Sequence, residues 1–385
     1  MRNAIRLAAL AGMLLTTAAA KAEIVVGFVT ALSGPAASIG IPYGRGIAAA
    51  FEYAATVNGE KIRLIQLDDG SDPSAATRNA RKLVEEEKVD ILIGTSTVPG
   101  AMAMIAVANE LKVPMIAISP ISVPPSDTGE RWGIAVPQPP NLMVKVVTER
   151  MKRDGIKNLG YIGFSDAWGD LVYSGAKSAE AAAADGIKVS SNERYARTDT
   201  SVTGQILKLL SAHPDAVLDG GSATQGALPL LALAERGYKG KLYGTPGLLN
   251  ADFIRVAGKS AEGILVSAGP VIVAEQLPDT HFSKKLSLAF REAHLKATGV
   301  ATVDGFSAYS FDAWLIFLDA AKRAMANAKP GTPEFRTALK DAMFSTKELS
   351  GTHAVYNFTP ASSYGVDERG LVLVRLVDGV WKFEP

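Results

Sequence analysis

The side chains that could act as nucleophiles, bases or metal ligands are few in this 385-residue chain. There is no cysteine, and the histidines lack the spacing of metal ligands, lying apart at His213, His281, His294 and His353. The segments "GTSTVPG" and "GGSATQG" do not fit the G-x-S-x-G pattern of a hydrolase nucleophile, and no histidine stands where its base would be expected. We therefore expect no catalytic residue, no metal site and no cofactor.

Two further motifs resemble functional sites but have simpler explanations. The segment "YGRGIA" (residues 43–48) matches the G-x-G-x-x-A pattern of dinucleotide-binding loops, but no strand leads into it, so close helix packing explains its glycines better. The acids of "LDDGSDP" (Asp68, Asp69 and Asp72) have the wrong order for an EF-hand calcium loop. Asp72 before Pro73 instead predicts the cap of a helix. An enzyme has little support in these residues.

The elements that would carry a site alternate between short β-branched runs and amphipathic patterns. Continuous apolar strands separated by such helices indicate parallel sheets covered on both faces. The proline-rich segment "VPQPPN" (residues 136–141) separates two such series, so we predict an α/β protein with two doubly wound lobes. In these sheets ligands bind beyond the carboxyl ends of the strands. In the first series the predicted helices cover about residues 43–57, 73–87 and 100–111.

The predicted domain boundaries follow from three passages of the chain between the lobes. The helices and strands beyond Val271 are too few for a third domain and are expected to complete the first two. The passages are predicted near Gln138, Gly269 and Ser350. Lobe 1 would then comprise residues 23–138 and 270–350, and lobe 2 residues 139–269 and 351–385.

The first 22 residues have the pattern of a secretory signal peptide. Basic residues precede the apolar "LAALAGMLL", and small residues follow, so we expect cleavage after Ala22. The absence of cysteine removes the usual acceptor of a lipid anchor, which favours a protein diffusing freely in the periplasm. Charges nearly cancel, with 40 Lys and Arg against 39 Asp and Glu, and no later apolar run could cross a bilayer. Neither nucleic-acid binding nor membrane insertion is expected.

Six segments, in this order and spread over most of residues 23–376, resemble the branched-chain amino-acid binding family of periplasmic solute receptors. They are "VTALSGPAASIG", "LDDGSDPSAATRNARKLVEEEKVDILIG", "VPMIAISP", "AWGD", "AVLDGGS" and "SAEGILV". The resemblance implies a type I periplasmic binding protein, whose two lobes are joined by three hinge strands and close on a ligand. It also implies an ABC importer with an inner-membrane permease as the partner. A monomer is expected.

The resemblance implies a set of ligand-binding residues as well. Thr97 and Val98, with the segment 121–123, correspond to the carboxylate grip, made of hydroxyls and backbone N–H groups at helix starts. Trp168 corresponds to the family's stacking aromatic and would form an apolar wall with neighbours from both lobes. For Phe306 and Tyr309 a core role is an equal alternative. The predicted ligand-binding residues are Ile39, Thr97, Val98, Ile121, Ser122, Val123, Trp168, Ser222, Pro246, Gly247, Phe306 and Tyr309.

Departures from the family pattern bear on the ligand. The tyrosine and glutamate that hold the ammonium in amino-acid receptors correspond to Ser222 and Pro246. Burying an ammonium without a partner would cost several kcal/mol. We therefore predict a small carboxylic acid ligand, aromatic or hydrophobic, without an α-ammonium. The alternatives are a receptor for a branched-chain or other amino acid, or a ligand-sensing protein on the same fold.

Overall fold

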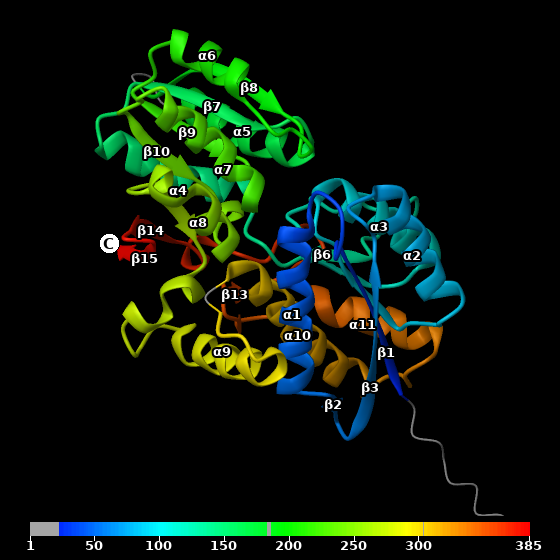
Figure 1. Cartoon of the computed structure of the whole chain (residues 1–385). Coiled ribbons are helices and arrows are strands. Elements are labelled where there is room, and N and C mark those ends of the chain that lie inside the picture. Colours follow the sequence, from blue (N-terminus) through cyan, green and yellow to red (C-terminus); the bar gives the residue numbers. More distant parts are fainter. Residues whose placement is uncertain (1–22, 183–185, 303) are drawn as a thin grey trace, which may run out of the picture.

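The computed structural model describes residues 23–182, 186–302 and 304–385. The predicted signal peptide and its cleavage after Ala22 lie outside the described residues. Two separate β-sheets form the centres of two lobes, as Figure 1 shows. The predicted α/β class with two lobes is confirmed.

Lobe 1 is built on a six-stranded sheet. It contains the strands β1 (Ile24–Thr30), β2 (Thr56–Val57), β3 (Glu60–Asp68), β4 (Ile91–Gly94), β5 (Met115–Ala117) and β6 (Gly133–Ala135). The strand order is β2-β3-β1-β4-β5-β6, and the strands pair in parallel except for β2. Its helices are α1 (Ala37–Tyr53), α2 (Pro73–Glu85), α3 (Val98–Leu111), α9 (Lys284–Thr298), α10 (Gly305–Ala324) and α11 (Pro333–Phe344).

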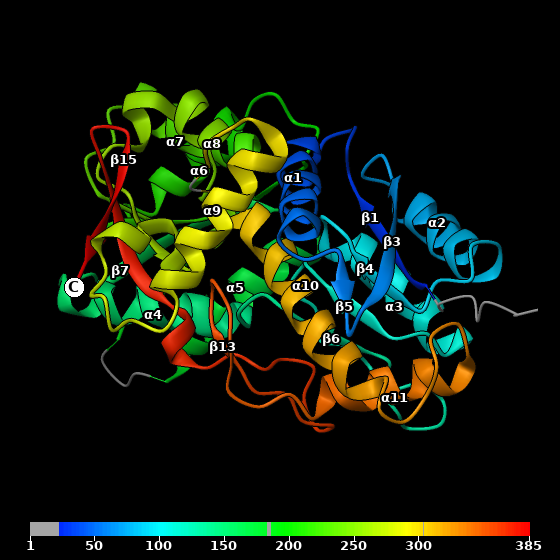
Figure 2. The same cartoon turned by 90° about the horizontal axis from the view of Figure 1, so that it is seen from below.

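Helices cover both faces of this sheet, which explains why β1 is apolar at almost every position. Val26 and Phe28 belong to the core shared with α1 and α10, whereas Val29 belongs to the core shared with α2 and α3. Figure 2 shows α1 and α10 side by side. A Cβ at Gly46 of α1 would fall 2.0 Å from the carbonyl oxygen of Ser307 in α10, which confirms the packing role of the "YGRGIA" glycines.

Lobe 2 is built on a seven-stranded sheet. It contains β7 (Asn158–Phe164), β8 (Lys188–Tyr195), β9 (Ala216–Gly220), β10 (Lys241–Gly244), β11 (Leu265–Ala268), β14 (Val372–Val377) and β15 (Val380–Glu384). The order is β15-β14-β11-β10-β9-β7-β8, with β14 and β15 antiparallel at one edge. Its helices are α4 (Pro140–Arg153), α5 (Ala167–Ala181), α6 (Thr203–Ser211), α7 (Ala223–Glu235) and α8 (Ala251–Ala257), with the short η1 (Pro246–Leu248) and η2 (Gly258–Ala261).

The starts of α1 and α2 follow from local chemistry. The predicted cap of α2 is confirmed, because the Asp72 carboxylate accepts the N–H groups of Ser74 and Ala75. Helix α1 begins at Ala37, earlier than the predicted residue 43, and it contains Pro42. A Cβ at Gly40 would fall 1.9 Å from a lobe 1 carbonyl oxygen, so glycine allows this early start beside β1.

Of the predicted passages between the lobes, Gln138 lies between β6 and α4, and Gly269 lies between β11 and η3 (Pro270–Gln276). The third passage differs from the predicted Ser350, which lies in a hairpin of β12 (Leu349–Ser350) and β13 (Val355–Tyr356). After this hairpin Tyr364 still bridges to Ala135 of β6, so the chain enters lobe 2 only near η4 (Glu368–Gly370). The reason is that these residues extend the edge of the lobe 1 sheet. Among the described helices none is long and apolar enough to cross a membrane.

Candidate functional site

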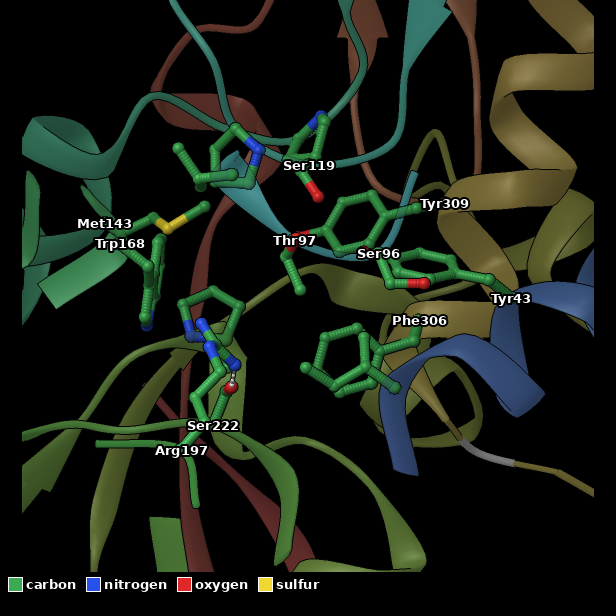
Figure 3. Close-up of a pocket in the computed structure, with 16 residues that line it drawn as sticks. Tyr43, Ser96, Thr97, Ser119, Met143, Trp168, Arg197, Ser222, Phe306 and Tyr309 are labelled. Atoms are coloured by element: carbon green, nitrogen blue, oxygen red, sulfur yellow. Dashed lines mark hydrogen bonds between the residues drawn. The ribbon is translucent and has the colours of Figure 1, made fainter. Parts of the chain in front are cut away.

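A pocket lies between the two lobes, where the carboxyl ends of strands from both sheets meet. Its empty volume, open solvent at the mouth included, is about 460 Å³. Figure 3 shows its lining residues. They are Ile39, Tyr43, Ser96, Thr97, Val98, Ser119, Pro120, Pro137, Met143, Trp168, Arg197, Ser222, Pro246, Gly247, Phe306 and Tyr309.

Hydrogen bonds between α1 and lobe 2 hold the lobes together beside this pocket. Ser38 Oγ lies 3.1 Å from Thr224 Oγ1, and Asn250 Nδ2 donates to the Ser38 carbonyl at 2.9 Å. That carbonyl is available because Pro42, four residues further along α1, has no N–H to donate to it. The lobes are therefore in contact beside the pocket.

Most of the predicted ligand-binding residues line this pocket, namely Ile39, Thr97, Val98, Trp168, Ser222, Pro246, Gly247, Phe306 and Tyr309. The structure does not bring the segment 121–123 to it. Ile121 and Val123 are buried in the lobe 1 core, while Ser122 is exposed. The Val123 N–H donates to Ser363 Oγ at 3.0 Å, so it is already used within the protein. The expected carboxylate grip thus keeps only its helix α3 half at the pocket.

Aromatic side chains from both lobes form much of the pocket wall. Tyr43 and Phe306 make an edge-to-face contact, with ring centroids 5.5 Å apart and planes at 75°. Trp168 faces them from lobe 2 and is held by a hydrogen bond from its Nε1 to the Gly221 carbonyl at 3.3 Å. These rings are held by the protein before a ligand arrives, so a flat ligand could stack without ordering them.

The hydroxyl groups of lobe 1 are mostly engaged within the protein. Thr30 Oγ1 donates to the Gly40 carbonyl, so its contact of 2.8 Å with Ser96 Oγ uses the Ser96 hydrogen. Ser119 Oγ donates to the Thr95 carbonyl at 2.6 Å. Thr97 differs, because its Oγ1 accepts the Gly100 N–H and its hydrogen has no acceptor within the described ranges. Lobe 1 therefore offers a ligand the Thr97 hydroxyl and the start of α3.

Arg197 is a pocket residue that the sequence reasoning missed. Its Nε donates to Asp166 Oδ2 at 2.6 Å, and its Nη1 donates to Ser222 Oγ at 3.2 Å. The guanidinium carbon lies 4.0 Å from the centre of the Phe164 ring. These contacts leave donors on the two terminal nitrogens, because a guanidinium carries five N–H groups. The side chain is 15% exposed, so solvent screens its charge only weakly.

The electrostatics of the pocket favour an anion. Among the described residues that line it, none is acidic and Arg197 is the only charged one. The Asp166 carboxylate binds Arg197 and also accepts the Trp168 and Gly169 N–H groups, so its oxygens are occupied. Burial raises the pKa of Asp219, behind the start of α7, to about 8, which leaves this carboxyl mostly neutral at pH 7. No described carboxylate thus lines the pocket.

A sequence signal for Arg197 did exist. It stands in "YARTD", two residues after the end of β8, and the loops after parallel strands are where ligands bind in this fold. The family correspondence did not point to it, and a single arginine in a loop carries no pattern by itself. The other lining residues that were not predicted are Tyr43, Ser96, Ser119, Pro120, Pro137 and Met143.

Two lobes with a pocket between them are the arrangement typical of a solute-binding protein. The chain belongs to the periplasmic binding protein family, whose sequence model matches residues 23–362, and the resemblance is confirmed. A solved extracellular ligand-binding receptor from Rhodopseudomonas palustris HaA2 is 42% identical, with a TM-score of 0.88 over 94% of this chain and 100% of that chain. Leu/Ile/Val-binding protein homolog 3 of Brucella melitensis is 26% identical over 256 residues, 64% of this chain and 67% of that protein.

A further solved relative has a ligand in its title. It is a solute-binding protein of an ABC transporter from R. palustris in complex with benzoate. It is 21% identical, with a TM-score of 0.74 over 94% of this chain and 95% of that chain. At this identity the likeness extends to the fold, and the ligand of the present chain has to be argued from its own pocket.

Proposed function

We propose that this protein is the substrate-binding receptor of an ABC importer and that it traps a small carboxylic acid between its lobes. The acid is aromatic or hydrophobic and lacks an α-ammonium. The observation that carries the proposal is the charge of the pocket, where Arg197 supplies a cation and no described lining residue supplies an acid. An α-ammonium would lie unpaired in this pocket, at a cost of several kcal/mol.

The proposed orientation differs from the one expected from the sequence, in which lobe 1 alone held the carboxylate. We place the carboxylate at the free donors of Arg197 and the Ser222 hydroxyl, next to the start of α7. The body of the ligand would then lie among Tyr43, Trp168 and Phe306. A second polar group of the ligand could reach the Thr97 hydroxyl, while an apolar acid would leave that hydroxyl to water.

The relatives support a receptor and differ in the ligand. The solved complex with benzoate shows that this fold can bind an aromatic acid. The Leu/Ile/Val-binding protein homologue favours the alternative, an amino-acid ligand. We propose an ABC permease of the inner membrane as the partner. We further propose that the receptor is a monomer in the periplasm and that it is exported with cleavage after Ala22. No catalytic role and no cofactor are proposed.

Calorimetry with matched ligand pairs tests the proposal. 3-Phenylpropanoate against phenylalanine, and 4-methylpentanoate against leucine, isolate the ammonium while the rest of the ligand stays nearly the same. The amine-free acid should bind more tightly, by about tenfold for each 1.4 kcal/mol of unpaired charge. Tighter binding of the amino acid in both pairs would overturn the proposal and favour an amino-acid receptor.

A further inference from the structure

Tyr309 belongs both to the pocket and to the segments that join the lobes. It lines the pocket from α10, with its side chain 4% exposed. Its hydroxyl donates to Gln138 Oε1 at 2.5 Å, and its ring stacks on His353 with centroids 3.7 Å apart and planes at 10°. The ring that would touch a ligand is therefore also in contact with the hinge.

The contacts of Tyr309 reach all three passages between the lobes. Gln138 lies at the first passage, and its Nε2 donates to the Gly370 carbonyl at the third, at 2.7 Å. His353 lies against Gly269 at the second passage, so closely that a Cβ on Gly269 would fall 1.8 Å from its Nδ1. One side chain thus connects, directly or through one neighbour, segments that lie more than a hundred residues apart in the chain.

The His353 ring is held firmly as a support for this stack. Asp312 accepts the backbone N–H groups of Thr352 and His353, at 2.7 and 2.9 Å, which anchors the segment to α10. The His353 Nε2 lies 2.9 Å from the Gly305 carbonyl, so this nitrogen carries the proton and donates it. Burial lowers the pKa of His353 to about 3, so the ring stays neutral at physiological pH.

We propose that Tyr309 is a positioning residue that couples occupancy of the pocket to closure of the hinge. When the lobes rotate apart, the backbone angles of the passages at Gln138 and Gly269 must change. The bond from Tyr309 to Gln138 and the contact of His353 with Gly269 then have to break or shift. A ligand that packs on the Tyr309 ring in its present position stabilises the arrangement in which these contacts are made. The ligand part of this proposal rests on the proposed function.

The test compares Tyr309→Phe with Tyr43→Phe. Both substitutions remove one buried hydroxyl from a tyrosine of the same pocket and keep its ring. The Tyr43 hydroxyl donates to the Ile118 carbonyl at 2.7 Å, a bond that lies wholly within lobe 1. Tyr43→Phe therefore serves as the matched control for any loss of stability or of pocket shape that does not involve the hinge.

Closure can be followed by fluorescence energy transfer, because the native chain contains no cysteine. Lys82→Cys in α2 and Lys208→Cys in α6 place one dye on an exposed position of each lobe. Without ligand, Tyr309→Phe should shift the ratio of open to closed molecules by roughly 2- to 10-fold toward open, as expected for one hydrogen bond. Tyr309→Phe should also release bound 3-phenylpropanoate faster than wild type, by a similar factor. Tyr43→Phe should leave the open-to-closed ratio without ligand unchanged, because its hydroxyl bond lies within lobe 1.

A second variant keeps the test decisive. If Tyr309 acts through Gln138, then Gln138→Ala should also favour the open form, and adding Tyr309→Phe to it should produce little further change. Equal open-to-closed ratios in Tyr309→Phe and Tyr43→Phe would overturn the proposal, as would additive effects of Gln138→Ala and Tyr309→Phe. The ligand-free measurement tests the hinge even if 3-phenylpropanoate does not bind, and that failure would count against the proposed function alone.

Discussion

Arg197→Gln is the substitution that most directly tests the charge of the pocket. It removes the guanidinium and retains a side chain that can still donate to Ser222 or Asp166. A hydrogen bond to a charged group contributes about 1.5–3 kcal/mol, so loss of the cation should weaken binding of a carboxylate by about 10- to 150-fold. The upper part of this range is expected, because Arg197 is mostly buried and because Asp166, now without its partner, would repel the ligand carboxylate.

The assay is calorimetry with 3-phenylpropanoate and with its neutral amide, 3-phenylpropanamide. Arg194→Gln is the matched control, because Arg194 is a lobe 2 arginine of similar burial, 21% exposed, that does not line the pocket. Its guanidinium bonds the Phe164 carbonyl at 2.9 Å and Asp170 at 3.0 Å. In Arg197→Gln the acid should lose much more affinity than the amide, and in Arg194→Gln neither should change greatly. Unchanged affinity for the acid, or equal losses for acid and amide, would refute the reasoning.

Two further predictions concern Trp168 and Asp219. Trp168→Ala should weaken the binding of 3-phenylpropanoate by about 1–3 kcal/mol. Trp168→Phe should keep most of the affinity but lose the fluorescence change on binding. Equal affinities in wild type and Trp168→Ala would show that stacking does not matter. Burial raises the pKa of Asp219 from its ordinary 3.8 to about 8 in the folded protein. Between about pH 4 and pH 8 the folded protein therefore keeps a proton that the unfolded chain has lost. The free energy of unfolding should fall over this range as pH rises, by up to roughly 1.4 kcal/mol per pH unit from this group. The free energy of unfolding of Asp219→Asn, measured in urea, should therefore rise relative to that of wild type as pH increases from 5 to 8. A difference that stays constant with pH would contradict a buried neutral carboxyl at Asp219.

The fold could be predicted from the sequence because its signals are local. Apolar strands, amphipathic helices and the Asp72 cap each occupy a few consecutive residues, and the Asp72 cap and the two sheets were found as expected. The start of α1 could not be predicted, because Pro42 usually signals the end or the beginning of a helix. It is tolerated inside α1 since the carbonyl that it leaves free accepts from Asn250, 212 residues away from Ser38.

The site could be predicted only where the family correspondence applied or where a residue follows a strand. Trp168 and Ser222 were placed at the pocket in this way, and both line it. The segment 121–123 was expected there, but the bond from Val123 to Ser363 joins residues 240 positions apart and turns this segment toward the edge of lobe 1. Arg197 reaches the pocket because Asp166 and Phe164, on other segments, hold its side chain, and no local pattern contains that information.

The architecture itself explains why the pocket should prefer anions. Helices α3, α5 and α7 begin at residues that line the pocket or adjoin it, with Thr97, Asp166 and Ser222 at their N-caps. A helix start carries about half a positive charge, and in a doubly wound sheet such starts gather at the carboxyl ends of the strands. To hold the ammonium of an amino acid, a pocket of this kind needs a carboxylate. In the described part of this chain, the Asp166 carboxylate is bonded to Arg197 and to the start of α5, and the Asp219 carboxyl is mostly neutral. The charged group that lines the pocket is instead the Arg197 guanidinium. Both the fold and the charge of the pocket lining therefore support the proposed preference for a carboxylate without an ammonium.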